Sequence, residues 1–203
     1  MRIICVNTGD KFGQWYVNNL RHMIDNFSGL NYDSFEVIEE EKHKVVFNKL
    51  QMFDKFRDGE NLYFDLDICI YDKVPNLIRK DLTVLHAWWR DRAHTSFNSS
   101  IISWTGDQSH IYKKFMEDTD MWQKKYNKGI DQMLEENFDV KTYRDYHKVC
   151  YSIQKKEYEP MDKNYSIVLF NQRQYLMEPG WSGWWSTYFL GHAEHALSND
   201  TRT

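Results

Sequence analysis

Apolar positions in the first third of the chain recur with two different periods. Short β-branched or alternating runs at residues 2–6, 34–40 and 61–67 predict three strands. Between them, apolar side chains recur every three or four positions over residues 14–24 and 45–56, which predicts two helices. The order strand, helix, strand, helix, strand is typical of an α/β unit with a mainly parallel sheet.

The pattern is less regular further along the chain. Residues 82–89 and 97–104 read as strands, residues 108–118 and 129–137 as helices, and residues 165–170 as a further buried strand. The remaining residues are rich in aromatic side chains and glycine and have no clear period.

Composition narrows the class of protein. A length of 203 residues suits one domain with its own core. The net charge is −4 and the charges are interspersed, so no basic stripe predicts binding to nucleic acid.

Cys5, Cys69 and Cys150 are odd in number and far apart, which favours reduced thiols in the cytoplasm. No stretch reaches the ~18 apolar residues of a transmembrane helix, so we expect a cytoplasmic protein, either dissolved or attached peripherally to a membrane.

The stretch LYFDLDICIYDKV, residues 62–74, places Asp65 and Asp67 inside an apolar neighbourhood. Residues i and i+2 of a strand face the same side, and ligands of open parallel sheets bind beyond the carboxyl ends of the strands. Two carboxylates there suit Mg²⁺ or Mn²⁺, which keep open positions for phosphate oxygens. The alternative is a chance pair that solvates a turn, because so short a motif is weak evidence alone.

Six segments in order resemble the GT-A-fold glycosyltransferases, most closely the family 8 type: IICVNTGDKFG, FNKLQMF, LYFDLDICIYDKV, FNSSIISW, KGIDQMLEE and IVLFNQR. The resemblance implies a single Rossmann-like nucleotide-sugar-binding domain over residues 1–180, with residues 181–203 as an aromatic extension. It also implies transfer of a sugar from a nucleotide-diphosphate donor, with UDP-sugars favoured, to an acceptor hydroxyl. The implied cofactor is Mn²⁺ or Mg²⁺.

The resemblance also assigns the nucleotide and metal positions. Thr8 and Gly9 would line the nucleotide pocket, Asp65 would contact the ribose or the metal, and Asp67 would ligate the metal. Asn171, in FNQR, stands where relatives often have a histidine as a further metal ligand. An amide oxygen can bind a hard cation, but it is neutral, so this departure implies weaker or nucleotide-dependent metal binding.

Two further segments correspond to the sugar positions of the family. Asn98 and Ser99 would face the donor sugar, and Asp131 and Gln132 would lie near the reacting carbon. If the reaction inverts the anomeric centre, Asp131 would be the general base. If it retains the configuration, Asp131 or Gln132 would stabilise an oxocarbenium-like state.

Two basic residues could bind the donor diphosphate. Lys49 lies on the predicted helix 45–56, and a solvated helix lysine is the alternative. Arg173 could neutralise the leaving diphosphate with its fork of donors, and an ordinary surface arginine is the alternative.

Aromatic clusters at residues 88–90 (WWR) and 181–185 (WSGWW) could contact sugar rings, but tryptophans in a small domain are more often core. His192 and His195 have H-x-x-H spacing, but they lie in a segment that looks terminal, so we discount a metal site there.

Two rival functions stay open. A sugar nucleotidyltransferase normally needs a glycine-rich basic loop that NTGDKFG matches poorly, and a non-catalytic carbohydrate- or nucleotide-sugar-binding protein would keep the same fold.

Overall fold

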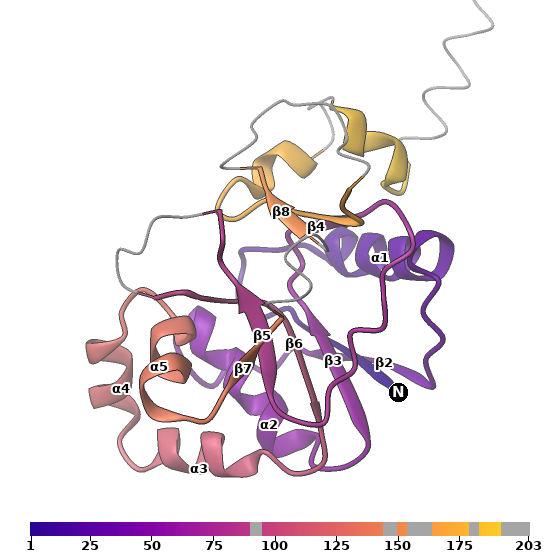
Figure 1. Ribbon diagram of the computed structural model, residues 1–203. Helices are drawn as coiled ribbons and strands as arrows, with labels where there is room; N and C mark the ends of the chain where they lie inside the picture. Colours follow the sequence, from indigo (N-terminus) through magenta and orange to yellow (C-terminus); the bar gives the residue numbers. More distant parts are fainter. Residues whose placement is uncertain (90–94, 144–149, 154–163, 179–182, 192–203) are drawn as a thin grey trace, which may run out of the picture. The chain divides into compact units, whose positions relative to one another are not determined.

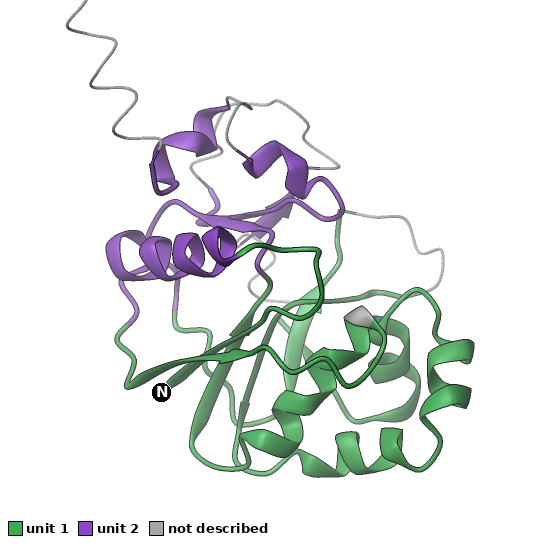
Figure 2. Cartoon of the chain, turned by 180° about the vertical axis from the view of Figure 1, so that it is seen from behind, with its two compact units in different colours: residues 1–13, 31–65, 76–147 green, residues 14–30, 66–75, 148–203 purple. Residues whose placement is uncertain are grey.

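The computed structural model describes residues 1–89, 95–143, 150–153, 164–178 and 183–191. Arg90, Trp181, His192 and His195 therefore lie outside the described residues. The chain forms two compact units (Figure 2): unit 1 comprises residues 1–13, 31–65 and 76–147, and unit 2 comprises residues 14–30, 66–75 and 148–203. The boundary between Asp65 and Leu66 assigns the two aspartates of the D-x-D sequence to different units.

Unit 1 contains a six-stranded sheet (Figure 1). In spatial order its strands are β2 (Ser34–Ile38), β1 (Arg2–Val6), β3 (Glu60–Phe64), β6 (Phe97–Thr105), β5 (Thr83–His86) and β7 (Lys141–Thr142). β1 is parallel to β2 and β3, and β5 is parallel to β7, whereas β6 is antiparallel to both of its neighbours. Five strands thus point one way, and the predicted α/β class with a mainly parallel central sheet is confirmed.

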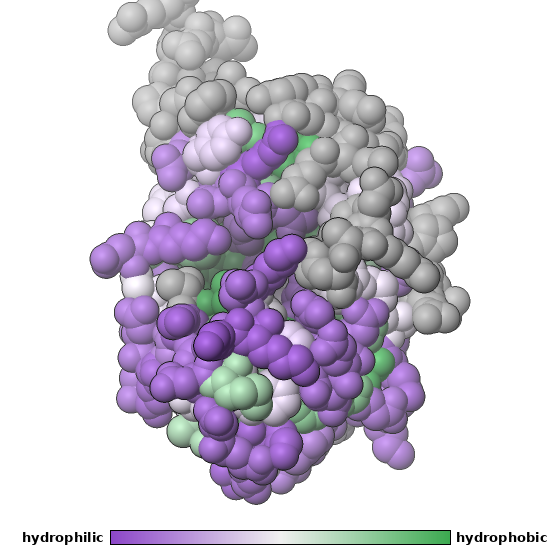
Figure 3. Space-filling view, turned by 90° about the vertical axis from the view of Figure 1, so that its left-hand side faces the viewer, coloured by the Kyte–Doolittle hydropathy of each residue, from purple (hydrophilic) through white to green (hydrophobic). Residues whose placement is uncertain are grey.

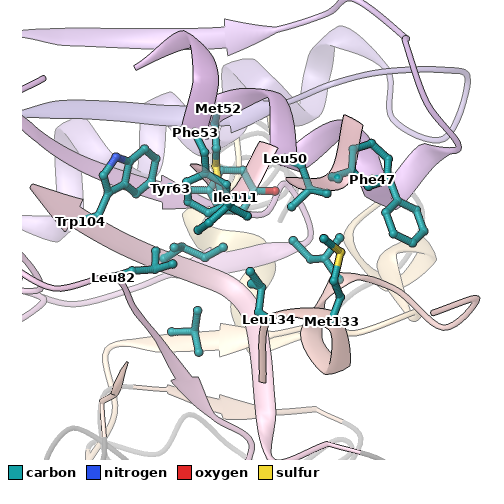
Figure 4. Packing of buried hydrophobic residues seen from close by; sticks show 14 of the residues in the cluster. Phe47, Leu50, Met52, Phe53, Tyr63, Leu82, Trp104, Ile111, Met133 and Leu134 are labelled. Carbon is teal, nitrogen blue, oxygen red and sulfur yellow. The ribbon is translucent and has the colours of Figure 1, made fainter. Parts of the chain in front are cut away.

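The helices of unit 1 are the 3₁₀ helix η2 (Val45–Leu50), α2 (Gln51–Lys55), α3 (Ser109–Met116), α4 (Thr119–Lys125) and α5 (Ile130–Asn137). Their apolar sides pack on one face of the sheet, where Phe53 and Leu134 from the helices meet Tyr63 and Trp104 from the strands (Figure 4). The predicted helix 45–56 is thus two helices of different winding. α4 was not predicted, and the side chain of Asp118 caps it by accepting a hydrogen bond from the backbone N of Met121.

Unit 2 has its own small sheet, in the order β4 (Ile68–Ile70), β9 (Ile167–Leu169) and β8 (Cys150–Ser152). β9 is antiparallel to β4 and parallel to β8. The unit also contains α1 (Gln14–Met23), the π-helix η1 (Ile24–Ser28) and two 3₁₀ helices, η4 (Gln174–Met177) and η5 (Trp184–Tyr188). All nine residues of the three strands are buried, so this sheet is the centre of a second core.

Hydrophilic residues predominate among the described residues on the face shown in Figure 3. Within the described part of the chain, the large hydrophobic side chains that are exposed are Val46, Met116, Met121 and Tyr175. None of the helices in the described ranges is long and apolar enough to cross a bilayer.

Candidate active site

The carboxyl ends of β1 and β3 lie at one edge of the unit 1 sheet, because the two strands are parallel neighbours. β6 runs in the opposite direction, so it begins at the same edge, and its Phe64↔Ile101 pairing with β3 fixes that register. The backbone N of Asp65, directly after β3, donates to the carbonyl of Ser100 at 2.8 Å. This edge therefore gathers residues that are far apart in sequence, as expected for the ligand-binding edge of an α/β sheet.

Asp65 is held by two neighbours in unit 1. Its Oδ1 lies 2.6 Å from Nζ of Lys49, and the two side chains are 17% and 16% exposed. The hydroxyl of Tyr63 donates to the same oxygen. Nζ of Lys49 also lies 5.4 Å from the centroid of the Tyr63 ring, within the range of a cation–π contact. The alternative of a solvated helix lysine is therefore wrong.

These contacts continue to the first turn of α5. Nζ of Lys49 lies 3.5 Å from Oγ of Ser99, and the backbone N of Ser99 donates to Oδ1 of Asp131 at 3.0 Å. We call Tyr63, Asp65, Lys49, Ser99 and Asp131 the polar row. It joins four predicted site residues to one another within unit 1.

Two other predicted residues have different partners. Asn98, 7% exposed, uses its side-chain oxygen to accept a hydrogen bond from the backbone N of Ser100. The side-chain amide of Gln132 donates to Glu136, one turn further along α5. Asn98 thus supports the start of β6, and Gln132 is directed along its own helix rather than into the polar row.

Thr8 is joined to this edge through Asn48, which is fully buried. The amide nitrogen of Asn48 donates to Oγ1 of Thr8 at 3.1 Å and to the carbonyl of His43. Its oxygen accepts from the backbone N of Lys42, the backbone N of His43 and the side chain of Gln51. Asn48 therefore ties the loop after β1 to the loop after β2, immediately beside Lys49.

Gly9 follows Thr8 with φ +68°, a conformation that costs other residues energy. The carboxylate of Glu41 lies against it, with Oε1 3.5 Å from the position that a Cβ would occupy. Glycine is thus required by the backbone, and the acidic side chain comes from the loop that Asn48 anchors.

Asp67 and Asn171 lie close together along the small sheet of unit 2. The backbone N of Phe170 donates to the carbonyl of Asp67 at 2.9 Å, so Asn171 is one residue beyond the partner of Asp67. Asp67 is 9% exposed, and the amide nitrogen of Asn171 donates to Oγ of Ser152. Because the nitrogen is directed at Ser152, the pair offers a carboxylate and an amide oxygen, donor types that suit a hard cation. Among the described residues, no three His, Cys, Asp or Glu side chains form a group that could hold a metal ion.

The charge of Asp67 acts on a neighbour in α1. The hydroxyl of Tyr16 lies 3.2 Å from Oε1 of Glu178, and burial, Glu178 and Asp67 together raise the pKa of this tyrosine. The hydroxyl therefore stays protonated, and can still donate a hydrogen bond, at pH values above the ordinary tyrosine pKa of 10.0.

Arg173 closes a tight turn after β9. Its backbone N donates to the carbonyl of Phe170 at 3.0 Å, and the two residues between them, Asn171 and Gln172, have φ of 40° and 68°. Positive φ at both central positions is the signature of a type I′ turn.

The described tryptophans of the two aromatic clusters divide by burial. Trp185 is 2% exposed and donates to the carbonyl of Leu176, and Trp89 is 4% exposed. Packing is therefore their role in the structure. Trp88 and Trp184 are only partly buried, so each leaves part of its ring on the surface.

Sequence reasoning missed Tyr63 and Asn48. A signal existed for Tyr63, because it precedes Asp65 by two positions in an extended segment and so shares its face. No signal existed for Asn48, whose partners are mostly backbone groups of a loop.

No protein-family model and no curated protein sequence matches the chain. Solved structures do. The glycosyltransferase GlyE of Streptococcus pneumoniae TIGR4 matches with a TM-score of 0.60 and 11% identity, covering 100% of this chain and 65% of GlyE. An active-site mutant of LgtC matches with a TM-score of 0.62 and 10% identity, covering 100% of this chain and 97% of that one.

A glycosyltransferase involved in glycosylation of the major capsid of PBCV-1 matches with a TM-score of 0.58 and 11% identity, covering 86% of this chain and 98% of that one. This chain has the fold of these glycosyltransferases. These matches support the expected GT-A fold. The chain spans only 65% of the length of GlyE. At such low identity the likeness concerns the fold alone.

Proposed function

We propose that this protein is a glycosyltransferase that moves a sugar from a nucleotide-diphosphate donor, with UDP-sugars favoured, to an acceptor hydroxyl. The observation that carries the proposal is the polar row at the ligand-binding edge of the sheet, on a fold shared with glycosyltransferases. A carboxylate, an ammonium group and a second carboxylate joined in one row can bind a charged donor and stabilise a charged transition state.

Lys49 would bind the donor phosphates. It is the cation of the polar row, and its ammonium group already lies near Ser99 at the start of β6. The resemblance implies that Asn98 and Ser99 face the donor sugar. Thr8 and Gly9, at the end of β1, would line the nucleotide pocket. Binding the donor at several fixed points would supply much of the rate acceleration, because it holds the anomeric carbon in place for attack.

Asp131 would act at the reacting carbon. The hydrogen bond from the backbone N of Ser99 orients its carboxylate without a flexible partner. In that position it would take the proton of the acceptor hydroxyl in an inverting reaction, or stabilise positive charge on the sugar ring in a retaining one. Gln132, which is directed at Glu136, supports the second role less well than Asp131.

We further propose that activity depends on Mn²⁺ or Mg²⁺, with the carboxylates of the D-x-D sequence and the amide oxygen of Asn171 as ligands. A bound cation would stabilise the charge that develops on the departing nucleoside diphosphate. Arg173, the last residue of the turn that contains Asn171, would add a second positive charge for the same leaving group.

The test is to incubate the protein with Mn²⁺ and a panel of UDP-, GDP- and ADP-sugars. Donor turnover is measured as release of the nucleoside diphosphate. We expect one donor class to turn over and Asp67→Ala to reduce turnover about 10²-fold or more, as loss of a transition-state-stabilising group does. Asp72→Ala is the matched control, since Asp72 is an exposed aspartate five residues away in the same unit.

Undiminished turnover in Asp67→Ala would contradict the metal-site assignment. Binding of a nucleoside diphosphate without turnover of any donor would contradict catalysis and favour a binding protein with this fold.

A further inference from the structure

We infer that Lys49 takes the place of a cation at Asp65 when no nucleotide is bound, so that nucleoside diphosphate and divalent cation bind cooperatively. The inference rests on the proposed function, because it concerns the same donor site. It gives Lys49 a second role in addition to binding phosphate, which is to keep Asp65 from binding metal in the absence of nucleotide.

The first observation is the crowding of one oxygen. Oδ1 of Asp65 accepts from the hydroxyl of Tyr63 and lies 2.6 Å from the ammonium nitrogen of Lys49. A divalent cation bound at this oxygen would lie next to the ammonium group, and like charges at such a separation repel. Metal and Lys49 therefore compete for Asp65.

The second observation is that the ion pair is sheltered. The side chains of Lys49 and Asp65 are 16% and 17% exposed, so water and salt screen their attraction less than at the surface. The face of the Tyr63 ring lies 5.4 Å from the ammonium nitrogen and adds a further attraction. Lys49 is thus held in the competing position.

The third observation shows how nucleotide would relieve the competition. A lysine carries its charge on a flexible four-carbon stem, and Oγ of Ser99 lies 3.5 Å from the ammonium nitrogen on the side of β6. A donor diphosphate bound there offers the ammonium group an anionic partner of higher charge than one carboxylate. Once Lys49 pairs with phosphate, Asp65 is available to the cation.

Linkage then fixes a quantitative consequence. If UDP raises the affinity for Mn²⁺ by some factor, Mn²⁺ must raise the affinity for UDP by the same factor. Because Lys49 is the cause, removing its charge should strengthen binding of Mn²⁺ alone and weaken binding of UDP alone. A lysine that only bound phosphate would show the second effect without loss of the coupling.

The test is calorimetric titration of Mn²⁺ into the full chain with and without UDP, and of UDP with and without Mn²⁺. In the natural protein we expect UDP to raise Mn²⁺ affinity at least about tenfold, within the usual range of such couplings. In Lys49→Met we expect Mn²⁺ alone to bind about tenfold more tightly and the coupling to fall to about twofold or less. Lys49→Gln, which keeps a hydrogen-bond donor without the charge, should behave in the same way.

Two control variants separate the charge of Lys49 from other effects. Lys44→Met removes a positive charge from an exposed position of unit 1 and should change both affinities less than about twofold. Tyr63→Phe removes only the neutral donor to Asp65 and should retain the coupling. Thermal unfolding of each variant verifies that it is folded.

Three outcomes would overturn the inference while leaving the proposed function intact, because UDP would still bind. They are Mn²⁺ affinity that does not increase in Lys49→Met and Lys49→Gln, coupling that persists in both, or loss of coupling in Tyr63→Phe. Failure of the natural protein to bind UDP with or without Mn²⁺ would instead contradict the proposed function itself.

Discussion

At the scale of single residues, the departure at Asn171 has a structural reason of its own. Asn171 and Gln172 occupy the two central positions of the type I′ turn, and asparagine tolerates positive φ better than most residues. The amide nitrogen of Asn171 also donates to Oγ of Ser152, in strand β8 of the same sheet. The turn therefore explains an asparagine where a histidine was expected, whether or not the side chain also ligates a metal.

Gln172 is the strained member of this turn. Its φ of 68° places a long side chain in the left-handed region, which costs about 1–2 kcal/mol for a residue other than glycine. Part of the gain from glycine is lost to its greater freedom in the unfolded chain. We expect Gln172→Gly to raise the free energy of unfolding by about 0.5–1 kcal/mol, measured by urea denaturation.

The matched control is Gln174→Gly, the same substitution inside the 3₁₀ helix η4, where glycine should destabilise. Equal destabilisation by both substitutions would show that Gln172 is not strained.

At the scale of elements, the sequence predicted long periodic segments well and short ones poorly. The strand 97–104 and the helices 108–118 and 129–137 are confirmed within two residues at their ends as β6, α3 and α5. The predicted helix 45–56 is divided into the 3₁₀ helix η2 and the α-helix α2. β8 has only three residues, too few for a period to be read.

The same contrast applies to the candidate site. The end of a predicted strand located Asp65, whereas the resemblance to GT-A-fold glycosyltransferases located Thr8 and Ser99. All three lie at one edge because neighbouring strands of an α/β sheet bring their ends together. The contacts that hold them could not be read, since the hydrogen bonds of Asn48 and Ser99 depend on loop and strand register. A pattern predicts which edge bears the site, whereas the partners of each side chain require the three-dimensional structure.

The 3₁₀ helix η5 gives a prediction at this scale. A Cβ on Gly183, which precedes η5, would lie 2.5 Å from two ring carbons of Trp185, too close for any relaxed contact. Trp185 cannot move freely, because it is 2% exposed, donates to Leu176 and packs edge-on against Phe170. We expect Gly183→Ala to lower the free energy of unfolding by about 1–3 kcal/mol, the usual cost of overpacking.

Gly13→Ala is the control in the same denaturation experiment. A Cβ at Gly13 meets no atom within 4 Å, and its φ is not in the left-handed region, so this substitution should cost little. A similar loss of stability in both variants would mean that the contact with Trp185 is not the cause.

At the scale of the whole molecule, the three cysteines are buried in the cores of two different units. Cys5 lies in unit 1, Cys69 and Cys150 lie in unit 2, and all three are buried free thiols. The expectation of thiols rather than a disulfide framework is confirmed. Burial raises the pKa of Cys69 and Cys150, and burial together with the charge of Glu39 raises the pKa of Cys5 from 9.0 to about 12.

These shifts predict how thiol reactivity and stability change with pH. At pH 8 a rise of three pKa units lowers the thiolate fraction of Cys5 about a thousandfold. We therefore expect a disulfide reagent at pH 8 to label essentially none of the three cysteines in the folded protein, and all 3 after denaturation in urea. Labelling of any thiol at the rate of free cysteine without urea would contradict the burial of that residue.

The direction of the pH effect on stability follows from the same pKa values. A thiol whose pKa is raised on folding favours the folded state below its ordinary value of 9.0 and loses that advantage as the pH rises towards 12. We expect the free energy of unfolding to fall between pH 9 and pH 11, and to fall less steeply in Cys5→Ala, which has lost one of the three buried thiols. The comparison of slopes cancels the lower overall stability of the variant, so an identical slope in the two proteins would show that Cys5 ionises in the folded state as easily as in the unfolded chain.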